Sequence, residues 1–107
     1  MGLTILLVDD DQILTEKTKN SLNWDSLGIG MVFTANNIHE AKGILKVYKV
    51  DILLCDVDMP MGSGLELVEW IREEGMEIKC IFLSSYANFT YAQKALRLGS
   101  VNYLLKP

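Results

Sequence analysis

Short apolar runs recur along the chain and are separated by polar or mixed segments. They are rich in Ile, Leu and Val, and most are continuous instead of alternating with polar residues. Strands of a parallel sheet that is covered on both faces have this pattern. The sequence therefore predicts five strands, at Leu3–Val8, Met31–Ala35, Ile52–Cys55, Ile78–Leu83 and Val101–Leu105.

The segments between these runs have the spacing of amphipathic helices. The predicted stripes are Ile38, Ala41, Ile44, Leu45 and Tyr48; Leu65, Val68 and Ile71; and Ala92, Ala95, Leu96 and Gly99. A helix from about Gln12 to Leu22 is patterned less clearly, with Leu14, Thr18 and Leu22 on one side. Capping residues agree with this division: Asp11 for the first helix, Asn36 or Asn37 for the second, and Gly75 and Gly99 at the ends of the third and fourth.

Strict alternation of strand and helix predicts an α/β fold with a doubly wound parallel sheet, because parallel strands need right-handed crossover connections. With 107 residues the chain can bury one sizeable core but not two, so residues 1–107 are expected to form one domain. Four helices would cover five strands unevenly. We therefore expect the last helix of the fold to be missing from this chain, which would make it a C-terminally truncated domain.

Composition and charge exclude several classes of protein and of partner. Half of the residues are hydrophobic and 22% are charged, which excludes a disordered chain. The net charge is −4 and the Lys and Arg residues are scattered, so we expect no direct nucleic-acid binding by this domain. No apolar segment approaches the ~20 residues of a membrane span, and no secretion signal begins the chain. The expected location is the cytoplasm, without a membrane partner.

The two cysteines, Cys55 and Cys80, lie inside apolar runs, which predicts buried free thiols in a reducing compartment. The single histidine, His39, lies in a polar stretch and is expected to be exposed. Without a CxxC or Cys/His cluster, most zinc and copper sites are excluded.

Acidic residues follow two of the predicted strands. Asp9, Asp10 and Asp11 follow the first strand, and Asp56 ends the third. If the strand order is 2-1-3-4-5, Asp9, Asp10 and Asp56 face one another across about one strand spacing, ~5 Å. Two carboxylates ~4 Å apart repel by about 4 kcal/mol at an effective dielectric near 20, so the cluster must bind protons or a cation. An all-oxygen ligand set favours Mg²⁺.

Two further polar groups follow the fourth and fifth strands. Ser84 supplies a hydroxyl, and the flexible side chain of Lys106 could reach the acidic cluster. A carboxylate cluster, a divalent ion, a hydroxyl and a lysine together indicate a site of phosphoryl transfer. Each residue alone also has a plain interpretation: Asp11 as a helix cap, Asp9 and Asp10 as solvated turn residues, and Ser84 as an ordinary strand end. Asp56 is harder to explain this way, because a carboxylate that ends a buried strand needs a partner.

The motifs Leu6–Asp11, Asp51–Pro60, Phe82–Tyr86 and Tyr103–Pro107 together resemble the receiver domain of two-component response regulators. The resemblance covers the whole chain and implies a flavodoxin-like five-stranded sheet in the order 2-1-3-4-5. It implies that Asp56 accepts a phosphoryl group from a sensor histidine kinase. Asp9 and Asp10 would form the acidic pair that holds Mg²⁺, with Asp10 and Asp56 as direct ligands.

Four more roles follow from the same resemblance. The backbone carbonyl of Asp58 would complete the metal ligands, and the Ser84 hydroxyl would bond the phosphate with Lys106 as its charge partner. Tyr103 would be the aromatic switch that turns inward as Ser84 moves, although it could also be a plain strand aromatic. A cis bond is expected between Lys106 and Pro107. Asp58 departs from the pattern of many relatives, which have a neutral residue there, and adds charge beside the metal.

The stretch Asn23–Ile29 and the Tyr-Ala-x-x-Ala-Leu pattern of Tyr91–Leu96 are similar to receivers attached to AraC-type DNA-binding domains. The implied partners are a histidine kinase and the protein's own helix-turn-helix output domain, which would control transcription. A homodimer is a further possible partner state, because apolar surface left uncovered by the missing last helix would favour pairing with a second copy. Two other classes of protein are alternatives to a functional receiver. A haloacid-dehalogenase-type phosphatase shares the Asp56-Val57-Asp58 motif but places it near the N-terminus, and a degenerate receiver would lack residues that this chain has.

Overall fold

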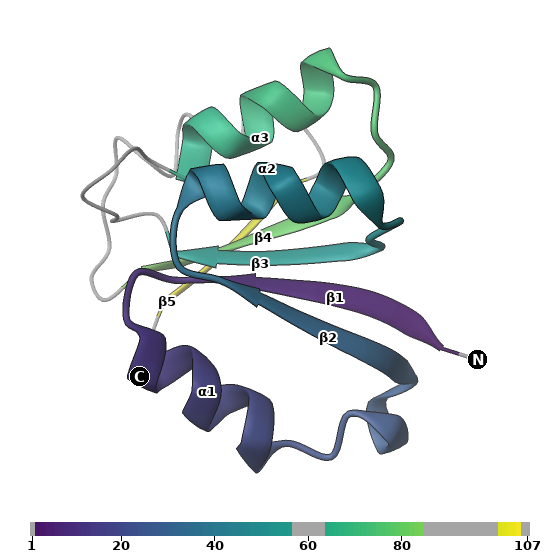
Figure 1. Cartoon of the computed structure of the whole chain (residues 1–107), viewed down its shortest axis with the longest axis vertical. Coiled ribbons are helices and arrows are strands. Elements are labelled where there is room, and N and C mark those ends of the chain that lie inside the picture. The colour runs from purple at the N-terminus through teal and green to yellow at the C-terminus, as the bar shows by residue number, and fades with distance from the viewer. Residues whose placement is uncertain (1, 57–63, 85–100, 106–107) are drawn as a thin grey trace.

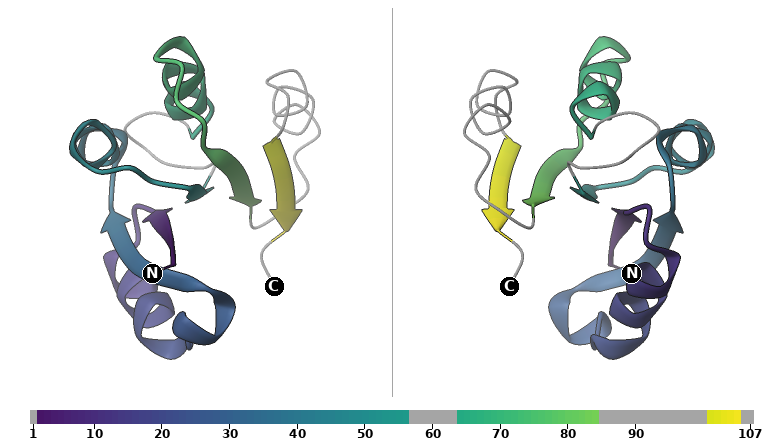
Figure 2. Two further views of the ribbon diagram at one scale, coloured as in Figure 1. Left: turned by 90° about the vertical axis from the view of Figure 1, so that its right-hand side faces the viewer. Right: turned by 90° about the vertical axis from the view of Figure 1, so that its left-hand side faces the viewer.

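The computed structural model describes residues 2–56, 64–84 and 101–105. Its elements follow in the order β1 (Leu3–Val8), α1 (Gln12–Ser21), the 3-10 helix η1 (Asp25–Leu27), β2 (Ile29–Ala35), α2 (Ile38–Val47), β3 (Ile52–Asp56), α3 (Gly64–Glu73), β4 (Lys79–Ser84) and β5 (Val101–Leu105). The strands form one parallel sheet in the order β2-β1-β3-β4-β5, which confirms the predicted order. Figure 2 shows β2 at one edge of this sheet and β5 at the other.

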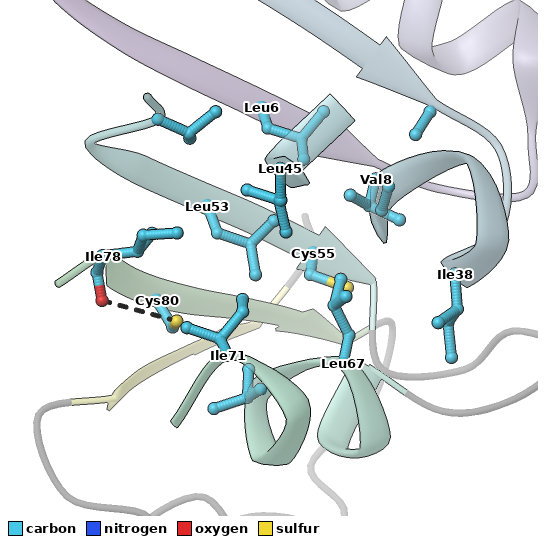
Figure 3. Packing of buried hydrophobic residues seen from close by; sticks show 14 of the residues in the cluster. Leu6, Val8, Ile38, Leu45, Leu53, Cys55, Leu67, Ile71, Ile78 and Cys80 are labelled. Atoms are coloured by element: carbon cyan, nitrogen blue, oxygen red, sulfur yellow. Dashed lines mark hydrogen bonds between the residues drawn. The ribbon is translucent and has the colours of Figure 1, made fainter. Parts of the chain in front are cut away.

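Helices α2 and α3 cover one face of the sheet, and α1 lies on the opposite face (Figure 1). The larger core lies under α2 and α3, where alternate strand residues meet the apolar sides of both helices (Figure 3). Leu53 of β3 and Leu67 and Ile71 of α3 are fully buried there. A smaller cluster on the other face contains Ile5, Leu7 and Ile29. Because successive strand residues point to opposite faces, β1 contributes to both cores.

Capping residues fix where the helices begin. The Asp11 carboxylate accepts a hydrogen bond from the Leu14 N–H at 3.0 Å and caps α1. Of the two candidates before α2, Asn37 is the cap, since its side-chain oxygen accepts from the Glu40 N–H at 2.8 Å. Gly75 ends α3 with a φ of 71°, a left-handed conformation that favours glycine.

The structure differs from the sequence prediction in the first helix and its neighbours. Leu14 and Leu22 are exposed, and the residue that α1 buries is Thr15. Strand β2 begins at Ile29, two residues earlier than predicted, directly after the unpredicted helix η1. The predicted helix around Ala92–Gly99 lies outside the described residues.

Both cysteines are buried and free, and His39 is exposed, as predicted. Burial raises the pKa of the Cys55 thiol, and the nearby Asp56 carboxylate adds to the shift. Burial also raises the pKa of Cys80, while Arg72 opposes the shift. These thiols therefore act as small apolar side chains of the core.

Candidate phosphoacceptor and metal site

The parallel register brings the ends of β1 and β3 together. Val8 is paired with Ala35 of β2 on one side and with Cys55 of β3 on the other. Asp9 directly follows Val8 and Asp56 directly follows Cys55, so the two carboxylates start from neighbouring positions of the sheet. Asp9 and Asp56 are 8% and 5% exposed, which is low for carboxylates. The chain buries them at the edge where loops after parallel strands form binding sites.

Three carboxylates converge at this edge. Ligand oxygens of Asp9, Asp10 and Asp56 all lie within 4.8 Å of one another, close to the spacing of about 5 Å predicted from neighbouring strands. Asp9 and Asp56 are buried, whereas Asp10 is exposed and lies on the open side of the cluster. The predicted proximity of these three side chains is confirmed.

The electrostatics of the cluster favour a cation. Partial removal from water by its neighbours raises the pKa of the Asp10 carboxyl, although Asp10 is exposed overall, and the hydrogen bond and negative charge of Asp9 raise it further. This direction means that the ionised form of Asp10 is disfavoured in the metal-free fold. A divalent cation would remove the repulsion, and three carboxylates form the hard oxygen donor set that Mg²⁺ prefers.

The loop between β1 and α1 is fixed by several hydrogen bonds. The Asp9 N–H donates to the Ala35 carbonyl at 3.1 Å, and the Asp9 carboxylate accepts from the Asp11 N–H at 3.0 Å. The side-chain amide of Asn36 donates to the Asp9 carbonyl at 2.9 Å. The same amide nitrogen lies 3.3 Å from the Thr15 hydroxyl oxygen. The contacts of Asn36 with Asp9 and Thr15 were not predicted from the sequence, where Asn36 is a candidate only for a helix cap.

The remaining predicted site residues are described less fully. Ser84 is the last residue of β4 and follows Leu83, whose Cα pairs with Asp56, so its backbone lies at the same edge of the sheet. The backbone of Tyr103 lies in β5, paired with Phe82. The side chains of both lie outside the described part of the chain. Asp58, Lys106 and the Lys106–Pro107 bond also lie outside it.

Comparison with known proteins identifies the family. The family model of the response regulator receiver domain matches residues 5–107. The chain belongs to that family. Among curated proteins, the receiver is 36% identical over 103 residues to the transcriptional regulatory protein YesN of Bacillus subtilis (strain 168), covering 96% of this chain and 28% of YesN. The receiver thus spans less than a third of that relative's length.

Solved structures agree with this assignment. The receiver matches the receiver domain of AraT, a response regulator from Geobacillus stearothermophilus, with a TM-score of 0.85 and 34% identity, covering 100% of this chain and 83% of that one. It also matches a two-component transcriptional regulator AraC from Clostridium phytofermentans ISDg, with a TM-score of 0.88 and 30% identity, covering 98% and 81% of the two chains. The resemblance found in the sequence motifs is confirmed. In the described ranges, none of the helices is sufficiently long and apolar to span a bilayer.

Proposed function

We propose that this receiver accepts a phosphoryl group on Asp56 from a sensor histidine kinase, with Mg²⁺ held by Asp9, Asp10 and Asp56. The observation that carries the proposal is the convergence of these three carboxylates within 4.8 Å at the carboxyl edge of the sheet. In the transfer, a carboxylate oxygen of Asp56 forms a bond to phosphorus as the bond between phosphorus and the kinase histidine nitrogen breaks. The domain assists its own phosphorylation and dephosphorylation but is not otherwise an enzyme.

The metal and the acidic residues have different roles in this proposal. Mg²⁺, when bound, neutralises charge on the phosphoryl oxygens and so allows an anionic nucleophile to approach an anionic donor. Asp9, buried and held by its backbone on both sides, and Asp10, on the open side, supply the fixed negative charge that retains the ion. The carbonyl of Asp58 completes the ligand set in this proposal.

The proposed response to phosphorylation uses the neighbouring strands. The Ser84 hydroxyl and the Lys106 ammonium bind the new phosphate, and Tyr103 turns inward as Ser84 moves. Ser84 and Tyr103 lie on paired strands β4 and β5, so a shift at one strand end can reach the surface through the other. That surface controls an attached output domain.

The wider assignment follows from the relatives. YesN is a transcriptional regulatory protein, and two of the similar structures are named AraT and AraC. We propose a cytoplasmic response regulator whose AraC-type helix-turn-helix domain binds DNA and whose chains can pair as a homodimer. The receiver, with its net charge of −4, would not itself contact DNA.

The test is phosphorylation of the chain by acetyl phosphate with Mg²⁺, followed by intact mass and peptide analysis. We expect one acid-labile phosphoryl group on Asp56, and none in chelator. The Asp56→Asn variant should gain none. Asp25→Asn is the matched control, because Asp25 lies before β2, at the amino ends of the strands and so at the opposite end of the sheet from the cluster. An Asp56→Asn protein labelled at the normal rate would refute the assignment, and continuous turnover of phosphate esters would instead indicate a phosphatase.

A further inference from the structure

The peptide that joins Asp9 to Asp10 has a partner on another element. Its carbonyl, that of Asp9, accepts a hydrogen bond of 2.9 Å from the side-chain amide of Asn36, which lies between β2 and α2. Because a peptide unit is planar, fixing the Asp9 carbonyl also fixes the N–H and Cα of Asp10. Asn36 therefore sets the direction in which the Asp10 carboxylate leaves the backbone.

Asn36 is itself held on two sides. Its amide nitrogen lies 3.3 Å from the hydroxyl oxygen of Thr15, which is 4% exposed and donates its own hydrogen to the Gln12 carbonyl at 2.9 Å. The Thr15 oxygen is thus an acceptor for Asn36, and both amide hydrogens of Asn36 are used. The Asn36 backbone N–H donates to the Glu40 carboxylate at 2.8 Å. The first turn of α2 and the first turn of α1 together orient this side chain.

We propose that Asn36 is a positioning residue for the acidic cluster, which raises the affinity of Asp9, Asp10 and Asp56 for Mg²⁺ by fixing the Asp9–Asp10 peptide. The proposal rests on the proposed function, since it requires Mg²⁺ to bind at this cluster. Groups that orient metal ligands without touching the metal typically change affinity by about 10–100-fold. Asn36 acts on the backbone of the ligands and not on a ligand atom, so we expect roughly a 10-fold effect, at the lower end of that range.

The experiment measures Mg²⁺ affinity and metal-free stability separately on the full chain. Urea midpoints at increasing Mg²⁺ give the dissociation constant by linkage, and a curve in chelator gives the stability of the metal-free fold. Asn36→Ala should raise the dissociation constant for Mg²⁺ roughly 10-fold. Thr15→Val should raise it less, because the hydrogen bond to the Asp9 carbonyl remains, and Thr15→Ser should restore the wild-type value.

The matched control is Asn37→Ala. Asn37 is the neighbouring asparagine and caps α2, so its loss lowers metal-free stability without touching the Asp9 carbonyl. Its dissociation constant for Mg²⁺ should stay at the wild-type value. An unchanged constant in Asn36→Ala, or an equal rise in Asn37→Ala, would overturn the role of Asn36. A wild-type chain whose midpoint does not respond to Mg²⁺ would overturn the proposed metal site as well, which distinguishes the two failures.

Discussion

Replacing Asp10 with Asn is expected to stabilise the receiver when divalent cations are absent. The carboxylate oxygens of Asp9, Asp10 and Asp56 lie within 4.8 Å of one another. At that separation two unit charges repel by about 1 kcal/mol in bulk water and by about 3.5 kcal/mol at an effective dielectric of 20. Since Asp10 is exposed, solvent screens its charge and the lower part of this range applies. We expect the free energy of unfolding to rise by roughly 1–2 kcal/mol.

The gain should depend on pH in a defined direction. Partial desolvation and the neighbouring Asp9 raise the pKa of Asp10 above its ordinary value of 3.8, so the ionised carboxylate destabilises the fold. This penalty is present in full above the folded-state pKa and disappears as the pH falls below the ordinary value, where the wild-type carboxyl is protonated in both states. Asp10→Asn should therefore have a higher free energy of unfolding than the wild type at neutral pH, and this difference should disappear in acid.

Magnesium should reduce the stability advantage of Asp10→Asn over the wild type. At a concentration ten times its dissociation constant, a ligand of the folded state stabilises by about 1.4 kcal/mol. The wild type should gain this amount at neutral pH, and Asp10→Asn should gain less because one carboxylate ligand is lost.

The assay is a set of urea denaturation curves at neutral and mildly acidic pH, in chelator and in Mg²⁺. Glu77→Gln is the control, because it removes one exposed negative charge just before β4, at the amino end of the parallel strands and not at the carboxyl edge where the cluster lies. If Asp10→Asn were no more stable than Glu77→Gln in chelator at neutral pH, repulsion within the cluster would be too weak to demand a cation.

Three other predictions concern the scaffold. Leu53→Ala should lower the free energy of unfolding by about 2–5 kcal/mol in urea denaturation, because Leu53 is fully buried in the main core; a loss below this range would mean that the core collapses around the gap. Cys55 and Cys80 should react with a thiol reagent only after denaturation, and fast labelling of the native chain would contradict their burial. Gly43→Ala should stabilise α2 by about 0.5–1 kcal/mol, whereas Gly75→Ala should destabilise because its φ is 71°; equal effects on the two midpoints would refute this contrast.

The fold was predictable because local and global signals agree. Apolar runs such as Leu3–Val8 match the observed strands closely, since a strand buried on both faces must be apolar throughout. The buried side of helix α1 was harder to predict. This helix lies alone, among the described α-helices, on its face of the sheet, and Thr15 is the residue that it buries, so leucine spacing did not indicate its packed side. Helix η1 carries no periodic pattern, because three residues are too few for one.

The candidate site was predictable for the residues whose chemistry is unusual at their position. A carboxylate that ends an apolar strand, as Asp56 does, is costly to bury, and this cost made its role visible in the sequence. The support from Asn36 was not visible, because its contacts with Asp9 and Thr15 span 27 and 21 positions of the chain. Only the strand register brings those segments together, and a single asparagine before a helix is usually a cap.

The position of β1 in the sheet also has a kinetic consequence. β1 pairs with β2 and with β3, and the second pairing joins segments far apart in the chain, as shown by the hydrogen bond from the Thr4 N–H to the Asp51 carboxylate across 47 positions. Such long-range parallel pairings form slowly, because chain entropy is lost before the contacts compensate for it. Asp56 cannot meet Asp9 until β3 has docked on β1. A cation bound between them would thus stabilise only the fully formed sheet, which would slow its unfolding and leave its folding rate nearly unchanged.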